Sequence, residues 1–242
     1  MQIYPDDEAV QLGSKIIKSA EAAGVKHVVF SSAPYVSRLT NGKVSLNSLD
    51  VKAKIEEVGQ AATGFDTFTP VMVGWYLEQI GEFTADLYGG FPVKEDSEGI
   101  STCRLPLWGG KEQMPWISIA DDFGDIVHGI FLKPLRWNRR LVQCHADLLS
   151  AANMTTTYSA VTGKKTRFIP CVDIADMKAG IFDGVQNMFI YTQMRDGDYY
   201  PNGISEIETA AELKLAAFKA KRGKGRETLL TVREYFGREY GK

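Results

Sequence analysis

The sequence predicts an α/β protein in which helices flank a mostly parallel sheet, with a small, loop-rich lobe towards the C-terminus. Three observations indicate this class. Helical and strand patterns alternate over residues 1–88, short β-branched runs within them are typical of buried strands, and after residue 88 the apolar pieces become short and are separated by Pro and Gly. Strands that alternate with helical patterns are typical of parallel sheets.

Residues 1–88 supply the elements of the expected sheet. Pro5-Asp6-Asp7 is a helix start signal, and Gly24 ends the first helix. The β-branched and aromatic run that follows predicts a buried strand. The expected elements are, in order, helix 5–24, strand 25–32, helix 50–59, strand 66–73 and helix 77–87.

Residues 89–242 are expected to hold the C-terminal lobe and elements that return to the core, so that residues 1–242 form a single domain. Pro106, Gly109-Gly110 and Pro115 interrupt the apolar pieces over 103–116. The remaining expected elements are a strand and a helix within 117–131, strand 141–143, helix 148–162 closed by Gly163, strand 166–169, and helices 174–191 and 205–221.

Composition excludes several classes of function. The chain has 242 residues, 44% hydrophobic and 24% charged, with a formal net charge of −2. This charge gives no general reason to expect nucleic-acid or anionic-membrane binding, which needs clustered positive charge. The chain also has no apolar run approaching a membrane span. The basic stretch 214–242 is the local exception, and we interpret it as a solvated helix face.

Cysteine and histidine spacing predicts no metal site. Cys103, Cys144 and Cys171 lie far apart without a C-x-x-C pair, which favours a reducing compartment, and the N-terminus has no targeting pattern, so we expect a cytoplasmic protein. His128 and His145 have no ligand spacing. The acidic residues Asp121, Asp122 and Asp125 are expected to cap a helix rather than to bind a cation.

The most informative arrangement is Ser31-Ser32 at the end of the strand 25–32, followed by a helix that carries Lys52. In open α/β sheets, ligands collect at the carboxyl ends of the strands, so we expect these three side chains to point towards that rim. Two simpler interpretations stay open. In the first, Lys52 is a solvent-facing helix lysine, and in the second, the two serines cap a loop turn.

These residues also carry a resemblance. Residues 24–32 with 49–57 resemble the pattern "G-V-K-H-x-x-x-S-S … F-D-x-K-x-x-V-E-E" of the NmrA-like family, in the atypical short-chain dehydrogenase/reductase superfamily. Residues 74–79 are similar to its "P-G-F-Y-M-x-N", and residues 119–124 to its "D-x-x-D-I-G". The resemblance implies a partial Rossmann-type parallel sheet.

The resemblance also implies roles for individual residues. Lys52 matches the lysine of the superfamily's Tyr-x-x-x-Lys pair, while Ser48 stands where a reductase has tyrosine. An aliphatic hydroxyl is a poor general acid near neutral pH. The implied sets are Ser31, Ser48 and Lys52 for catalysis, Lys52, Ser32 and Pro34 for NADP or NAD, and Trp75, Tyr76, Trp108 and Trp116 for a substrate pocket. Core packing is the alternative for each of the aromatic residues.

One family motif has no counterpart in this sequence. Members begin with a strand and a T-G-x-x-G-x-x-G loop that holds the pyrophosphate, and no such loop occurs here. We therefore expect the strand 25–32 to leave one sheet edge unpaired, which favours association as a homodimer. A shortened gene product, a self-associating protein and a divergent protein that needs no dinucleotide all stay open as explanations.

The leading functional prediction is an NAD(P)-linked oxidoreductase acting on a small organic substrate such as a secondary metabolite. A non-catalytic redox-sensing regulator that binds a protein partner is the first alternative, and Ser48 in the acid position favours it. A cofactor-free isomerase or cyclase is the second. An apolar pocket in the second lobe would favour an enzyme.

Overall fold

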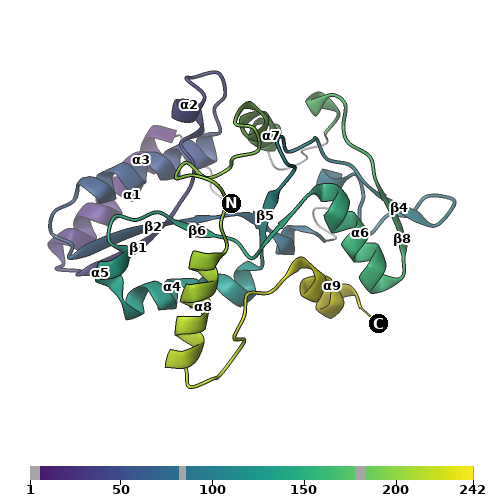
Figure 1. Ribbon diagram of the computed structural model, residues 1–242. Coiled ribbons are helices and arrows are strands. Elements are labelled where there is room, and N and C mark those ends of the chain that lie inside the picture. The colour runs from purple at the N-terminus through teal and green to yellow at the C-terminus, as the bar shows by residue number, and fades with distance from the viewer. Residues whose placement is uncertain (1–5, 82–85, 178–183, 242) are drawn as a thin grey trace. The chain divides into compact units, whose positions relative to one another are not determined.

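Chain segments that are far apart in sequence assemble into two units, which are described separately below (Figure 1). The computed structural model describes residues 6–81, 86–177 and 184–241. Unit 1 consists of Met1–Val73, Asp125–Cys144 and Tyr200–Glu227, and unit 2 consists of Gly74–Gly124, His145–Tyr199 and Thr228–Lys242.

Unit 1 is built on a three-stranded parallel sheet in the order β1-β2-β6. The strands are β1 His27–Ser32, β2 Thr67–Val73 and β6 Val142–Cys144. All residues of the central strand β2 are buried, as expected of a strand covered on both faces. Among the described residues β1 pairs with β2 alone, so it forms one edge of this sheet.

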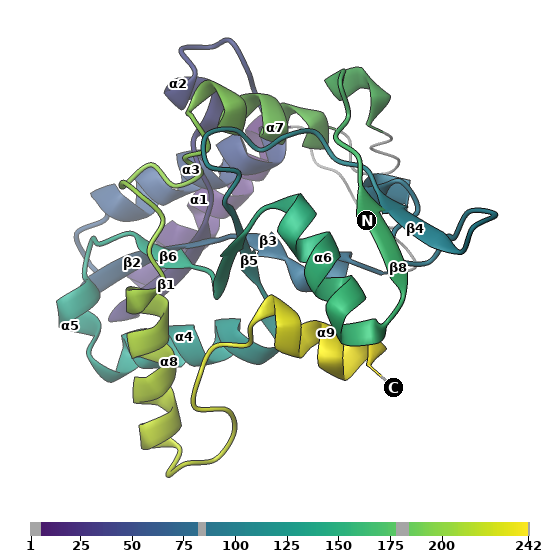
Figure 2. The same ribbon diagram turned by 45° about the vertical axis from the view of Figure 1, so that its right-hand side comes forward.

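Helices cover both faces of this sheet (Figure 2). On one face lie α1 Asp6–Ala22 and α3 Asn47–Ala61, and on the other lie α4 Gly124–Leu132, α5 Pro134–Trp137 and α8 Glu208–Ala220. Ile17 of α1 and Ile55 of α3 pack in one buried cluster with Phe65 and Phe68. The predicted α/β class is confirmed, with parallel strands flanked by helices.

Unit 2 has shorter strands in two small sheets. The first has the order β3-β5-β7, from Trp75–Tyr76, Met114–Ile117 and Asp147–Leu149, and the second pairs β4 Ile100–Cys103 with β8 Lys165–Phe168. Its helices are α6 Ala151–Thr162, α7 Val185–Met194 and α9 Val232–Tyr240. Two aromatic clusters fill the interior, one around Trp75 and Trp108 and one around Tyr158 and Phe236.

Two expected helices differ from the structure. In place of the start of helix 77–87 stands a single 3₁₀ turn, Leu77–Gln79, directly after β3, whose pairing with β5 holds only Trp75–Tyr76 extended. Helix 174–191 is replaced by a 3₁₀ turn at Ile174–Asp176 and the later helix α7. Residues 82–85 and 178–183, which belong to these expectations, lie outside the described residues.

The interpretation of the basic stretch 214–242 as a solvated face is wrong for Lys214. This side chain is only 1% exposed, and its Nζ lies 2.9 Å from a carboxylate oxygen of Asp125. The three acidic residues that were expected to cap a helix make tertiary contacts instead. Asp125 lies inside α4, Asp122 accepts the N–H of Leu230 at 2.9 Å, and Asp121 pairs with Arg238 at 2.7 Å.

None of the helices in the described part of the chain has the length and the apolar character that a membrane crossing would require.

Candidate functional site

Four polar side chains meet at the carboxyl end of β1 in unit 1. Ser31 and Ser32 are the last two residues of this strand. The Nζ of Lys52 lies 3.5 Å from the Oγ of Ser31, and the buried Ser32 hydroxyl donates to the carboxylate of Glu56. Lys52 and Glu56 are one turn apart on α3, so both project from the same helix face towards the strand end.

Burial sets the electrostatics of Lys52. It lowers the pKa of the ammonium group, because removal from water disfavours the charged form. A partly desolvated lysine beside a serine hydroxyl can donate hydrogen bonds to ligand oxygens at this rim. It can also exchange a proton more readily than a surface lysine.

The loop after β1 is held in place by side chains of its own. Ala33 and Pro34 are buried, and the N–H of Ser37 donates to the buried carboxylate of Asp50 at 3.0 Å. The Thr40 hydroxyl follows the short helix α2 Val36–Leu39 and bonds the carbonyl of Val36 at 2.9 Å. This part of the rim is therefore preorganised.

The predicted site residues separate into two groups. Ser31, Ser32 and Lys52 come together as expected, with buried Pro34 just beyond them, whereas Ser48 is exposed in the first turn of α3. Glu56 was missed, although its position four residues after Lys52 was a usable signal. The catalytic and cofactor roles of these residues remain predictions.

The aromatic residues expected in a substrate pocket belong to unit 2, and most of them pack in its core. Trp75, Trp108 and Trp116 are buried, and their indole N–H groups bond the Tyr88 hydroxyl at 2.7 Å, the Gly197 carbonyl at 3.1 Å and the Leu149 carbonyl at 2.9 Å. Buried indoles normally find such partners. Tyr76 is the only member of the set that is half-buried, and contact of any of the four with a substrate remains a prediction.

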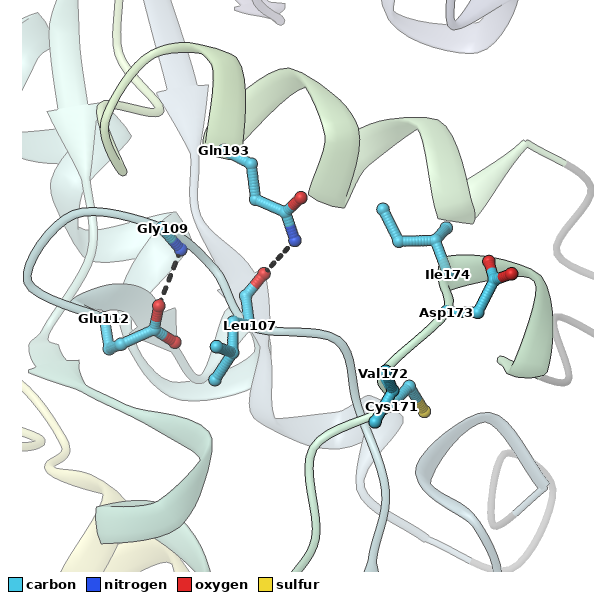
Figure 3. A pocket seen from close by; sticks show the side chains of 8 residues that line it. All are labelled: Leu107, Gly109, Glu112, Cys171, Val172, Asp173, Ile174 and Gln193. Atoms are coloured by element: carbon cyan, nitrogen blue, oxygen red, sulfur yellow. Dashed lines mark hydrogen bonds between the residues drawn. The ribbon is translucent and has the colours of Figure 1, made fainter.

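Unit 2 also contains an open pocket of about 670 Å³ that sequence reasoning did not find (Figure 3). It lies between the turn 107–112 and the segment 171–174, beside Gln193 of α7. The two lining segments are more than 50 residues apart, so no local pattern could have joined them. Within the described ranges, no group of three or more His, Cys, Asp or Glu side chains is placed to hold a metal ion.

The sheet of unit 1, with helices on both faces and a lysine at the carboxyl end of its edge strand, defines a Rossmann-like protein. Residues 3–226 match the NmrA-like family. The chain therefore belongs to the NmrA-like family. The family recognised from residues 24–32, 49–57 and 74–79 is thus confirmed.

Curated relatives of this chain are named as members of the same family. The chain is 45% identical over 237 residues to the NmrA-like family domain-containing oxidoreductase himF of Aspergillus japonicus, covering 95% of this chain and 71% of the relative. It is 41% identical to the NmrA-like family domain-containing oxidoreductase lnaB of Aspergillus flavus, covering 95% and 70%.

Solved structures share the fold. NmrA, a negative transcriptional regulator crystallised with NAD, superposes with a TM-score of 0.68 at 18% identity, covering 96% of this chain and 69% of that one. The triphenylmethane reductase of Citrobacter sp., crystallised with NADP(H), gives 0.63 at 11% identity, covering 99% and 74%.

The residues of this chain fit one end of a dinucleotide. The partly buried Lys52 and the Ser31 hydroxyl offer donors at the strand end, which suits a ribose. For the pyrophosphate, the sequence holds no glycine-rich loop between a strand and a helix.

Proposed function

We propose that this chain is an NAD(P)-linked oxidoreductase that acts on a small organic substrate. The observation that carries the proposal is the contact between Lys52 and Ser31 at the carboxyl end of β1. Ligands of open α/β sheets bind at this end of the strands. The names of the curated relatives, which are oxidoreductases of the same family, support the reaction class.

We assign the following binding and positioning roles to the residues of this site. Lys52 donates to the nicotinamide ribose, and Ser32 and Pro34 shape the rim beside it. Ser31 binds a substrate oxygen, and Glu56 positions Ser32 through their hydrogen bond. When bound, the dinucleotide supplies the hydride chemistry.

The position of Ser48 favours a second candidate function. Its exposed aliphatic hydroxyl cannot match a tyrosine as a proton donor near neutral pH. A regulator that binds the dinucleotide and a protein partner needs no such acid, and one structural neighbour is a negative transcriptional regulator. NADPH binding without NADPH oxidation in the presence of varied carbonyl and quinone acceptors would favour this candidate.

Titration of the full chain with NADPH and NADH, followed by nicotinamide fluorescence, tests the proposal. We expect binding with a Kd below about 100 μM, or roughly −5.5 kcal/mol. Lys52→Met should weaken it about tenfold, or about 1.4 kcal/mol. Lys54→Met is the matched control, because Lys54 lies two residues along the same helix and has no hydrogen bond to Ser31 among those observed. Absence of binding by folded protein would refute the proposal.

A further inference from the structure

The pocket of unit 2 has the size of a small-molecule site. Its volume of about 670 Å³ lies within the range of about 300–1,000 Å³ that is usual for ligand sites. Three apolar side chains and three polar ones dominate its lining (Figure 3). The apolar ones are Leu107, Val172 and Ile174, and the polar ones are Glu112, Asp173 and Gln193.

The wall formed by the turn 107–112 is fixed by hydrogen bonds. The Glu112 carboxylate accepts the backbone N–H groups of Trp108 and Gly109, both at 2.8 Å. The side-chain amide of Gln193 donates to the Leu107 carbonyl at 2.6 Å. A wall that is ordered before binding reduces the entropy cost of ligand capture.

The opposite wall is also tied to its surroundings. The N–H of Cys171 donates to the Leu105 carbonyl at 3.0 Å, and the Asp173 carboxylate accepts the N–H of Ala175 at 2.9 Å. Val172 between them is fully exposed. This wall therefore offers apolar surface to a ligand.

Two of the three polar side chains of the lining are carboxylates, and the third, the Gln193 amide, offers an acceptor oxygen beside its donor N–H groups. The carboxylates of Glu112 and Asp173 only accept hydrogen bonds when ionised. The bond from Gln193 to Leu107 turns the amide so that its oxygen points away from Leu107, towards the space in front of Ile174 (Figure 3). None of the lining residues that the structure describes is Lys, Arg or His.

Positive charge lies nearby but outside this lining. Lys111 lines an adjoining pocket of about 260 Å³, which shares Leu107 and Glu112 with the first. Arg104 acts electrostatically on Cys171, where Asp176 opposes it. Within the described part of the chain, the two carboxylates therefore share the pocket with no cationic lining residue.

We propose that this pocket binds a small organic amine. Its apolar body would lie against Leu107, Val172 and Ile174, and its ammonium or N–H group would donate to the acceptors of the lining. Charge-assisted hydrogen bonds to carboxylates make the ammonium form the preferred ligand. The assignment concerns unit 2 alone and does not depend on the proposed dinucleotide.

Matched probes test the charge requirement. Tryptamine and indole-3-propionate share an indole and differ in the sign of the charged end, and their binding to the full chain without dinucleotide can be followed by saturation-transfer NMR and calorimetry. Tryptamine should bind at least tenfold more tightly. Equal affinities of the two probes would overturn the proposal. So would the absence of tryptamine binding at about 5 mM, which corresponds to a binding free energy weaker than about −3 kcal/mol.

Substitutions in the lining test whether tryptamine binds in this pocket. Val172→Arg places a cation in the lining at a fully exposed position, so it should abolish tryptamine binding without changing the unfolding temperature. Ile204→Arg is the control, because Ile204 is 83% exposed and lines neither pocket. Asp173→Asn keeps the acceptor for Ala175 and removes one charge, so it should weaken tryptamine binding several-fold. Unchanged binding in both Val172→Arg and Asp173→Asn would exclude this pocket.

Discussion

Replacing Asp125 by Asn tests the buried ion pair of unit 1. Lys214 is 1% exposed, and its Nζ lies 2.9 Å from Asp125, whose side chain is 16% exposed. Lys221 donates to the other carboxylate oxygen. Asn preserves the shape of the side chain and an acceptor, so the substitution isolates the loss of charge.

The expected cost follows from the burial of Lys214. Removing one partner of a fully buried ion pair costs about 3–5 kcal/mol, because the remaining charge lacks compensation. The partial exposure of Asp125 allows water to screen the site, which places the expected loss of unfolding free energy at about 2–3 kcal/mol.

The loss should depend on pH. Burial by itself would raise the pKa of Asp125, but the hydrogen bonds from Lys221 and Lys214 outweigh it and lower the pKa. Because the folded-state pKa lies below the unfolded one, the stabilisation is complete above about pH 4 and disappears as the pH falls through the folded-state pKa. The difference between wild type and Asp125→Asn should therefore be full at pH 7 and shrink in acid.

Urea unfolding of Asp125→Asn, Lys214→Met and the double variant measures the effect. Lys214→Met removes the buried charge together with its need for a partner, so the double variant should recover most of the loss. Glu212→Gln, which breaks the half-exposed pair with Arg136, is the control and should cost less than about 0.5 kcal/mol. A cost below about 1 kcal/mol for Asp125→Asn, or additive costs in the double variant, would refute the reasoning.

Three further predictions concern packing, capping and assembly. Gly129→Ala should lower the free energy of unfolding in urea by more than about 2 kcal/mol, because its Cβ would lie 2.3 Å from the Leu213 carbonyl oxygen. Gly124→Ala is the control, because its Cβ would meet nothing within 4 Å, and it should be neutral or stabilising. Thr231→Ala removes the capping box of α9 and should cost about 1 kcal/mol in the same assay. Among the described residues β1 pairs with β2 alone, and this edge predicts dimers or larger species in sedimentation velocity; a monomer at high concentration would contradict this.

Several elements could be predicted from the sequence because their signals are local. The strands β1 and β2 are β-branched runs between turn signals, and α6 ends at Gly163, whose left-handed conformation closes the helix. The approach of Lys52 to Ser31 was predictable as well, because parallel strands and the following helix place such residues at one rim.

The sequence by itself determined the α/β class, the family and the position of Lys52 near the end of β1. The tertiary structure decided which helical patterns are helices, since the start of the expected helix 77–87 forms only the 3₁₀ turn Leu77–Gln79 after β3, which pairs with β5. It also decided that Lys214 is buried beside Asp125 rather than solvated, and that the turn 107–112 faces the segment 171–174. Periodicity reports which face of an element is apolar, but the partner of that face comes from distant residues, and only folding brings them together.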